Sequence, residues 1–292
     1  MFFDEEMLLD LRLNVLNKYV DKFVITEATY MHNGKPKKLV FDINKFSKFK
    51  DKIIYIVVDQ QPKDLLKIYE EDNNNQDTRG QKLVLNGYKR DNYQRQMAQG
   101  ALKKIDQDDW ILINDIDEIP NLDNVSLKNT KNKIVIFKQL MFFYKFNLLY
   151  PAMPWFGSKA CKKKDFINPQ WLRNVRQKKY PFWRFDVIFS KKKYNNVKVV
   201  NEGGWHFTNV KSPEDIEKKL LNYTHHYEYE KSGLSLNNLR DKVANRKILY
   251  DHNIDQKEYK WGSEKMLDKV ELSKMPDYLR ENYKKYLTWL DI

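Results

Sequence analysis

The chain has 292 residues, of which 41% are hydrophobic and 14% aromatic, so it holds enough apolar material for a sizeable core and is not a disordered chain. A single cysteine, Cys161, excludes an internal disulfide framework and is typical of a reducing compartment. Lys and Arg outnumber Asp and Glu by 53 to 40, and the resulting net charge of +13 favours phosphate-bearing or other anionic partners. Codon usage in an AT-rich genome is the alternative explanation of this balance.

The first half of the chain alternates short apolar runs with helical patterns, which is typical of an α/β protein. We expect a helix over residues 4–19, strands over 23–25 and 53–58, a flexible surface loop over 71–81, a helix over 90–104 and a strand over 110–113. Acidic residues stand at or just after the ends of these strands, namely Glu27, Asp59 and Asp115. Ligands of open α/β sheets bind at such strand ends.

Beyond residue 134 the apolar runs are richer in aromatic residues. They lie at 134–137, 141–146, 155–158, 182–189 and 203–207, and the first two predict strands. Helices are expected to close the chain. One begins at Ser212, with Pro213 in its first turn and acids at its positive end, and another is expected over 236–250.

The strongest chemical signal is the run Asp115-Ile116-Asp117-Glu118, which follows an apolar strand. Two carboxylates separated by one residue at a strand end can project to the same side. Hard oxygen ligands of this kind suit Mn²⁺ or Mg²⁺, which keep positions open for substrate phosphates. One carboxylate would hold the metal while the other contacts a ribose or a metal-bound water. The alternative is an acidic turn that a proline closes.

The run Gly203-Gly204-Trp205-His206 is the second signal. Paired glycines permit positive φ and close backbone approach. Trp205 offers a flat face to a sugar ring, and His206 could complete a metal site or contact phosphate. The alternative is a glycine bulge with a buried tryptophan and a hydrogen-bonded histidine.

Two predicted helices carry further candidates. Arg90, Asn92 and Arg95 precede the acidic strand, where guanidinium groups could bind a diphosphate or the base and ribose. His225 and Glu228 are three residues apart and share one helix face, from which they could reach a cleft. An ordinary solvated helix surface remains the alternative for both groups.

Other chemistries lack their sequence patterns. The chain has no nucleophile elbow, no Walker phosphate loop, no G-x-G-x-x-G and no Cys/His zinc spacing. Lysine runs at 162–164 and 191–193 occur without a recognisable nucleic acid-binding module, so nucleic acid is not an expected partner. No segment approaches the roughly 18 apolar residues that cross a membrane, and the first residues lack the features of a signal peptide. We therefore expect a cytoplasmic protein with at most peripheral contact with an anionic membrane.

Taken together and in this order, the motifs resemble glycosyltransferase family 17, the β-1,4-mannosyl-glycoprotein β-1,4-N-acetylglucosaminyltransferase family. The resemblance spans about residues 2–250. The segments that carry it are Phe2–Asn14, Val20–Glu27, Gly34–Lys37, Arg90–Arg95, Asn114–Pro120, Gly203–Phe207 and Thr224–Glu228.

The resemblance implies a single GT-A catalytic domain over residues 1–292. Its parts would be a Rossmann-like nucleotide-sugar half at 1–125, an acceptor half at 126–210 and C-terminal helices at 211–292. It also implies an inverting transferase that needs Mn²⁺ or Mg²⁺ and takes a UDP-linked sugar, for which UDP-GlcNAc is the family-based expectation.

The resemblance also implies roles for single residues. Asp117 would coordinate the metal, and Asp115 would support it or contact the donor ribose. His206, a candidate from its own run rather than from the resemblance, is the third expected metal ligand. The expected donor-side residues are Thr26, Glu27, Asp59, Arg90, Asn92 and Arg95. The expected acceptor- or sugar-binding residues are Trp155, Trp205 and His225.

Inversion by direct displacement needs a general base that takes the proton of the acceptor hydroxyl. The candidates are Glu118, Asp186, Glu202 and Glu228, with Glu202 preferred because it adjoins the glycine pair. The expected acceptor is a glycan, a lipid-linked sugar or a surface polymer of a bacterium or virus. The alternatives are a nucleotide-sugar hydrolase or pyrophosphorylase, and a basic RNA- or polyanion-binding protein in which the acidic run is only a turn.

Overall fold

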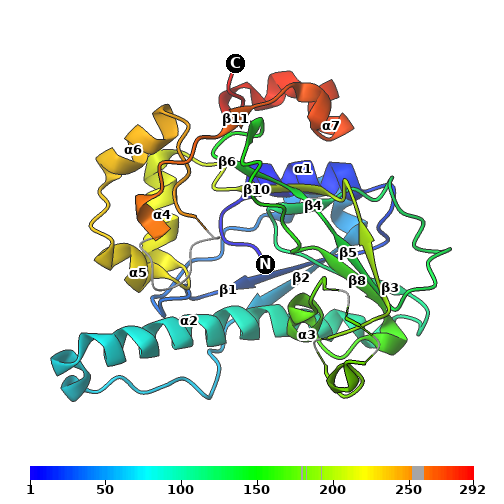
Figure 1. Cartoon of the computed structure of the whole chain (residues 1–292), viewed down its shortest axis with the longest axis horizontal. Helices are drawn as coiled ribbons and strands as arrows, with labels where there is room; N and C mark the ends of the chain where they lie inside the picture. The colour runs from blue at the N-terminus through cyan, green and yellow to red at the C-terminus, as the bar shows by residue number, and fades with distance from the viewer. Residues whose placement is uncertain (179, 182, 192, 252–259) are drawn as a thin grey trace.

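The computed structural model describes residues 1–178, 180–181, 183–191, 193–251 and 260–292, and within them it is a mixed α/β structure (Figure 1). Its helices are α1 (Glu6–Leu16), α2 (Gln76–Met97), α3 (Pro169–Asn174), α4 (Pro213–Asn222), α5 (His226–Lys231), α6 (Leu236–Ala244) and α7 (Asp277–Glu281). Its strands are β1 (Phe23–Ala28), β2 (Ile53–Val58), β3 (Trp110–Ile113), β4 (Glu118–Pro120), β5 (Ile134–Phe137), β6 (Leu140–Phe143), β7 (Leu148–Leu149), β8 (Lys159–Lys162), β9 (Val197–Val200), β10 (Gly204–Thr208) and β11 (Asp268–Lys269).

The described strands form three sheets. β1 and β2 pair in parallel, and a second sheet has the order β3-β8-β5-β9. The third sheet has the order β11-β7-β6-β10-β4, in which β10 lies parallel to β6 and antiparallel to β4. Asp115 follows β3 in the second sheet, whereas Glu27 and Asp59 belong to the first sheet. The three acids that stand at strand ends therefore do not share one sheet.

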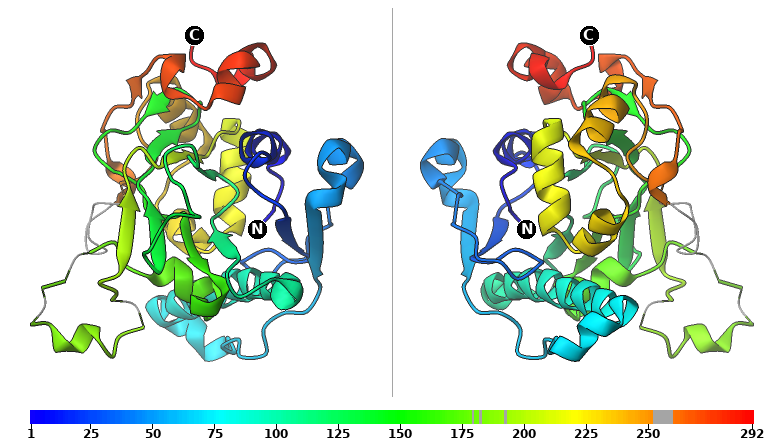
Figure 2. Two further views of the ribbon diagram at one scale, coloured as in Figure 1. Left: turned by 90° about the vertical axis from the view of Figure 1, so that its right-hand side faces the viewer. Right: turned by 90° about the vertical axis from the view of Figure 1, so that its left-hand side faces the viewer.

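Helices and loops pack the sheets around two main cores. α1 contributes leucines from more than one of its sides to the first core, between the sheets and the C-terminal segment, as expected of a helix that is buried nearly all round. α4 and α6 pack on β6 and β7 to form the second core. α2 runs along β1 and β2, and α4 to α6 gather at one end of the molecule (Figures 1 and 2).

The stretch 71–81, predicted as a surface loop, begins in a 3-10 turn and continues into α2. Asn75 caps that helix by accepting a hydrogen bond from the backbone of Thr78. The glycines Gly80 and Gly87 of α2 pack closely against other elements instead of ending the helix. A Cβ on Gly80 would strike the ring of Tyr227, and one on Gly87 would crowd Thr224. The seven-residue spacing of Gly80 and Gly87 puts both on the helix face that meets the α4–α5 region.

Other element boundaries also shift. The helix predicted over 90–104 is the end of α2 followed by a 3-10 helix at Ala98–Lys104, and the helix predicted over 236–250 ends at Ala244. β6 ends at Phe143, because Tyr144 takes a positive φ of 63°. The cap of α4 is confirmed, since Ser212 accepts from the backbone of Asp215. None of the described helices is long and apolar enough to cross a membrane.

Candidate active site

The turn that carries the two aspartates is held by one arginine of α1. Arg12 donates from Nη1 to the backbone carbonyls of Asp115 and Glu118, at 3.0 and 2.5 Å, and from Nη2 to the side chain of Asn114. Burial lowers the pKa of Arg12 to about 10, although the nearby carboxylates act in the opposite direction. The guanidinium thus stays charged at neutral pH and holds the turn in place through these hydrogen bonds.

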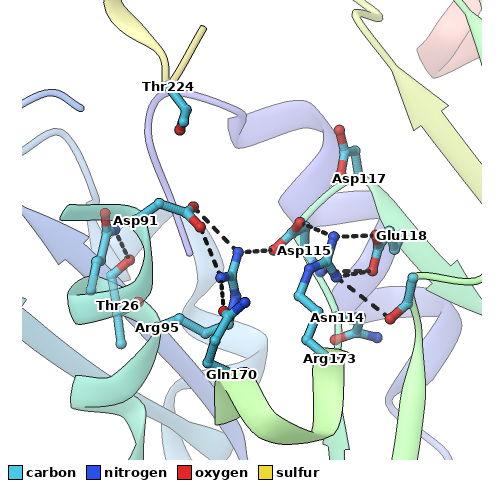
Figure 3. Close-up of polar contacts among 12 residues, drawn as sticks. Thr26, Asp91, Arg95, Asn114, Asp115, Asp117, Glu118, Gln170, Arg173 and Thr224 are labelled. Carbon is cyan, nitrogen blue, oxygen red and sulfur yellow. Dashed lines mark hydrogen bonds and ion pairs between the residues drawn. The ribbon is translucent and has the colours of Figure 1, made fainter. Parts of the chain in front are cut away.

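The carboxylate of Asp115 lies between two further arginines (Figure 3). Oδ1 is 3.3 Å from Arg95 on α2, and Oδ2 is 2.6 Å from Arg173 on α3. Arg95 is itself placed by Asp91 and Gln170, at 2.8 and 2.5 Å. Burial alone would raise the pKa of Asp115, but Arg173 and Arg95 outweigh burial and hold it below its ordinary value.

Glu118 is completely buried and its carboxylate is fully engaged. Arg173 approaches it with both terminal nitrogens, at 3.0 and 3.1 Å, and the indole of Trp155 donates to it at 2.7 Å. The backbone N–H of Asp115 also donates to it, at 3.0 Å. A Cβ at Gly157 would strike this carboxylate, so the close approach requires glycine there. Glu118 therefore organises the turn and has no access to an acceptor, which argues against its role as general base.

Strand pairing brings His206 to Asp117 across about 90 residues of sequence. β10 pairs with β4 so that His206 stands opposite Glu118, and the N–H of Phe207 donates to the carbonyl of Asp117 at 2.8 Å. His206 Nε2 then lies 3.6 Å from Oδ2 of Asp117. Burial would raise the pKa of Asp117, and the neighbouring His206 and Lys219 lower it overall.

The glycine pair makes this register attainable, and it has the positive φ and close backbone approach that the sequence predicted. Gly204 has a φ of 116°, and a Cβ there would collide with the backbone at Ile119 and Asn121. Gly203 approaches the backbone of Lys138 with similar closeness. Glycine therefore permits β10 to turn into its place between β4 and β6.

A pocket of about 210 Å³ opens beside the two aspartates. Both Asp115 and Asp117 line it, together with Lys219 from α4. The other lining residues come mainly from the first residues of the chain, the end of β1, α2 and the end of α4: Met1, Phe2, Phe3, Glu5, Ala28, Tyr30, Met31, His32, Lys37, Asp91, Gln94, Ile116, Asn222, Tyr223 and Thr224. Aspartates, a lysine and aromatic rings meet here, a combination that can bind a phosphate group next to a planar ring.

The residues predicted for the donor side lie only partly at this pocket. Thr26 and Glu27 are buried within β1, where Glu27 accepts from Lys37, from two backbone N–H groups and from Tyr55. Neither side chain is available to border a nucleotide, which argues against that prediction. Asp59 is exposed at the end of β2 and does not line the pocket.

Of the α2 residues predicted for the donor side, only one reaches the site. Arg95 reaches the site through Asp115. Arg90 instead bonds Gln61 at 2.8 Å and the carbonyl of His32 at 3.1 Å, beneath Gly34. Asn92 is half-buried and is not among the lining residues.

The remaining candidate bases lie away from the aspartates. Asp186 is ion-paired with Arg184 and Lys193 on a loop between α3 and β9, and Glu228 accepts from His225 at 2.6 Å. Glu202, the preferred candidate, lines a separate groove of about 870 Å³. None of the three lines the pocket beside Asp117 among the described residues.

The structure places the predicted sugar-binding residues in three different surroundings. Trp155 stacks on His206, with ring centroids 4.6 Å apart and planes at 23°, and so belongs to the site. Trp205 precedes His206 on β10 and points to the opposite face, where it lines the groove with Glu202. His225 bonds the Tyr88 hydroxyl at 2.8 Å next to the pocket residue Thr224.

Sequence reasoning missed four residues that the structure brings to the site: Arg12, Arg173, Lys219 and His32. Lys219 had a detectable signal, because it stands three residues after the buried Ile216 and next to buried Leu220 and hence near the inner face of its helix. Arg173 had none, since its partners are 55 to 58 residues away in sequence.

The structure thus defines a mixed α/β protein with an acid–histidine pair at the edge of a pocket. A family model described as glycosyltransferase family 17 matches residues 1–290, nearly the whole chain. The chain belongs to glycosyltransferase family 17, and the resemblance predicted from its motifs is confirmed. It is therefore a glycosyltransferase, for which the family implies a nucleotide-sugar donor and a glycan acceptor. No curated protein and no solved structure gives a significant match.

Proposed function

We propose that this enzyme uses a divalent cation, Mn²⁺ or Mg²⁺, to transfer a sugar from a UDP-linked donor, with UDP-GlcNAc as the first donor to test. The observation that carries the proposal is the meeting of Asp117 and His206 beside the pocket that Asp115 also lines. The arrangement fits a GT-A enzyme, in which the cation neutralises the leaving diphosphate.

The residues at the site fit a metal that also binds substrate phosphates. Ligand atoms about 2.1 Å from a shared cation lie roughly 3–4 Å apart, and the His206–Asp117 distance of 3.6 Å falls in that range. No group of three or more His, Cys, Asp or Glu within the described residues could hold a metal alone. Mn²⁺ and Mg²⁺ usually keep positions for water and phosphate oxygens, so a two-residue protein contribution is compatible with them.

In this proposal the two aspartates have different roles. Arg95 and Arg173 occupy both oxygens of Asp115, so Asp115 holds the arginines and the turn in place. Asp117, whose side chain is 16% exposed, has the carboxylate that is open to a cation. Lys219 lies close enough to lower the pKa of Asp117 and would meet the diphosphate on the same side of the pocket.

We propose a different general base, chosen from the carboxylates that line the pocket. Four carboxylates line the pocket, and Asp115 and Asp117 are already assigned. Asp91 is ion-paired with Arg95 at 2.8 Å. Glu5 accepts from the backbone N–H groups of Phe3 and Asp4, at 3.0 and 3.1 Å, and is the remaining candidate for accepting the proton of the acceptor hydroxyl. The expected acceptor is a glycan, including a lipid-linked sugar or a surface polymer.

Calorimetric titration tests the donor site. UDP, UDP-sugars and GDP-sugars are titrated into the protein with Mn²⁺ or with EDTA. We expect metal-dependent UDP binding that Asp117→Ala abolishes and that Glu202→Gln, in the separate groove, leaves unchanged. Equal UDP binding by Asp117→Ala and wild type would refute the metal assignment, and absence of nucleotide binding under every metal condition would refute the site.

A further inference from the structure

A loop between α3 and β9 exposes an unusual amount of apolar surface. Within residues 183–189, Phe189 is 88% exposed, Ile188 72%, Phe185 71% and Trp183 61%. The segment forms a single 3-10 turn, Phe185–Val187, and Figure 2 shows it standing out from the body of the molecule. Exposed apolar side chains that cluster on a protrusion mark a contact site rather than ordinary surface. We call the described residues 183–191 and 193 the projecting loop.

Basic residues flank these apolar residues in the sequence. The sequence from 176 to 193 contains seven Lys or Arg residues and one acid, Asp186. Asp186 is paired with Arg184 at 2.7 Å and with Lys193 at 2.6 Å, so its charge is neutralised within the loop. The sequence stretch that holds the projecting loop therefore combines an excess of six positive charges with exposed apolar side chains.

We propose that the projecting loop docks the enzyme on an anionic phospholipid bilayer. Phe185, Ile188 and Phe189 enter the boundary between headgroups and acyl chains, where aromatic side chains are favoured. Lys191 and Lys193 remain at the level of the lipid phosphates, to which basic residues are attracted. Lysine is depleted in protein–protein interfaces, so the three consecutive lysines at 191–193 favour a lipid surface over a protein partner.

Docking at this point places the candidate active site near the membrane. The loop begins nine residues after the end of α3, and Arg173 on α3 contacts Asp115 and Glu118. An acceptor sugar carried on a membrane lipid would then be presented close to the pocket. This consequence for the acceptor rests on the proposed function, whereas the docking itself does not.

Vesicle co-sedimentation tests the docking with the whole chain. The vesicles are phosphatidylcholine alone, or phosphatidylcholine with phosphatidylglycerol, each in about 0.1 M and 1 M salt, where the Debye lengths are about 10 Å and 3 Å. The test variant is Phe185→Ser/Ile188→Ser/Phe189→Ser. The control is Leu287→Ser/Ile292→Ser, which changes side chains that are 43% and 83% exposed near the other end of the molecule (Figure 1).

We expect wild type and control to bind the anionic vesicles, with binding reduced by high salt and much weaker on phosphatidylcholine alone. The triple variant should bind anionic vesicles at least about tenfold less, because three large apolar side chains no longer leave water. A wild type that binds no vesicles, or a triple variant that binds as wild type does, overturns the proposal. Equal binding to neutral and anionic vesicles overturns the role of the lysines.

Two further measurements keep the outcomes separable. Sedimentation velocity without vesicles shows whether the apolar tip joins two copies of the chain. If wild type forms a dimer, the triple variant is a monomer and wild type binds no vesicles, the loop is a self-association surface instead of a membrane-docking one. UDP titration with Mn²⁺ is run on the same variants. Retained UDP binding shows that the triple variant is folded and that failure of docking leaves the proposed function intact.

Discussion

Substituting Arg173 with methionine should destabilise the protein far more than a surface arginine would. The guanidinium faces two carboxylates, at 2.6 Å for Asp115 and 3.0 Å for Glu118, and the side chain of Glu118 has no solvent exposure. Removing one partner of a buried pair leaves an uncompensated charge, which costs about 3–5 kcal/mol. In a chain of this size such a loss lowers Tm by on the order of 10 °C.

Urea unfolding followed by tryptophan fluorescence at pH 7 measures this loss. The control is Arg280→Met, whose 44%-exposed side chain pairs with Asp277 on the surface of α7 and should change the free energy of unfolding by less than roughly 0.5 kcal/mol. The double variant Arg173→Met/Glu118→Gln should regain at least about 1 kcal/mol, because the buried charge of Glu118 is removed together with its partner. A loss below about 1 kcal/mol in Arg173→Met, or a double variant no more stable than the single one, would refute the reasoning.

Three further predictions concern residues behind the site. Burial, assisted by Arg173, lowers the pKa of Lys159 in the folded protein to about 8. Between about pH 8 and the ordinary lysine pKa, the unfolded chain therefore binds more protons at this residue than the folded protein does. Stability should rise with pH over that window by up to roughly 3 kcal/mol, and urea titrations should show a smaller rise in Lys159→Met. Gly157→Ala should cost about 1–3 kcal/mol by forcing a Cβ onto Glu118, whereas Gly100→Ala, with open space around it, should be near neutral in the same assay. Burial raises the pKa of Cys161 to about 12, so the native thiol should resist a thiol reagent at pH 8 and react only on unfolding; rapid reaction of the folded protein would contradict its burial.

Local patterns predicted the elements whose formation depends on neighbouring residues. The strands at 53–58, 110–113 and 134–137 and the cap at Ser212 were confirmed, because strand periodicity and helix capping are both readable over a few residues. The start of α2 was missed, because polar residues and Gly80 resemble a loop. The helix there is stabilised by contacts that the local sequence does not contain, notably the packing of Gly80 against Tyr227.

Long-range partners explain the errors at the site. The sequence analysis named His206 and Asp117 as candidate metal ligands, and the pairing of β10 with β4 brings their side chains to 3.6 Å. The sequence could not show that Glu118 is enclosed by Arg173 and Trp155, because these partners lie 37 or more residues away. Glu202 was favoured for its position beside Gly203, but its φ of 50° belongs to the turn before β10, and it faces the groove lined by Trp205.

Under the proposed function, the charges around the acidic run give its two aspartates different roles. Asp115 compensates Arg95 and Arg173, and these arginines in turn hold α2 and α3 against the turn. If a metal displaced either arginine from Asp115, a buried guanidinium would lose a partner, so the metal is expected on Asp117 and His206. In that proposal Asp115 would keep the turn in place through its two arginines while Asp117 binds the cation. A single aspartate could not meet both demands, since the oxygens that bind a cation cannot at the same time neutralise two arginines.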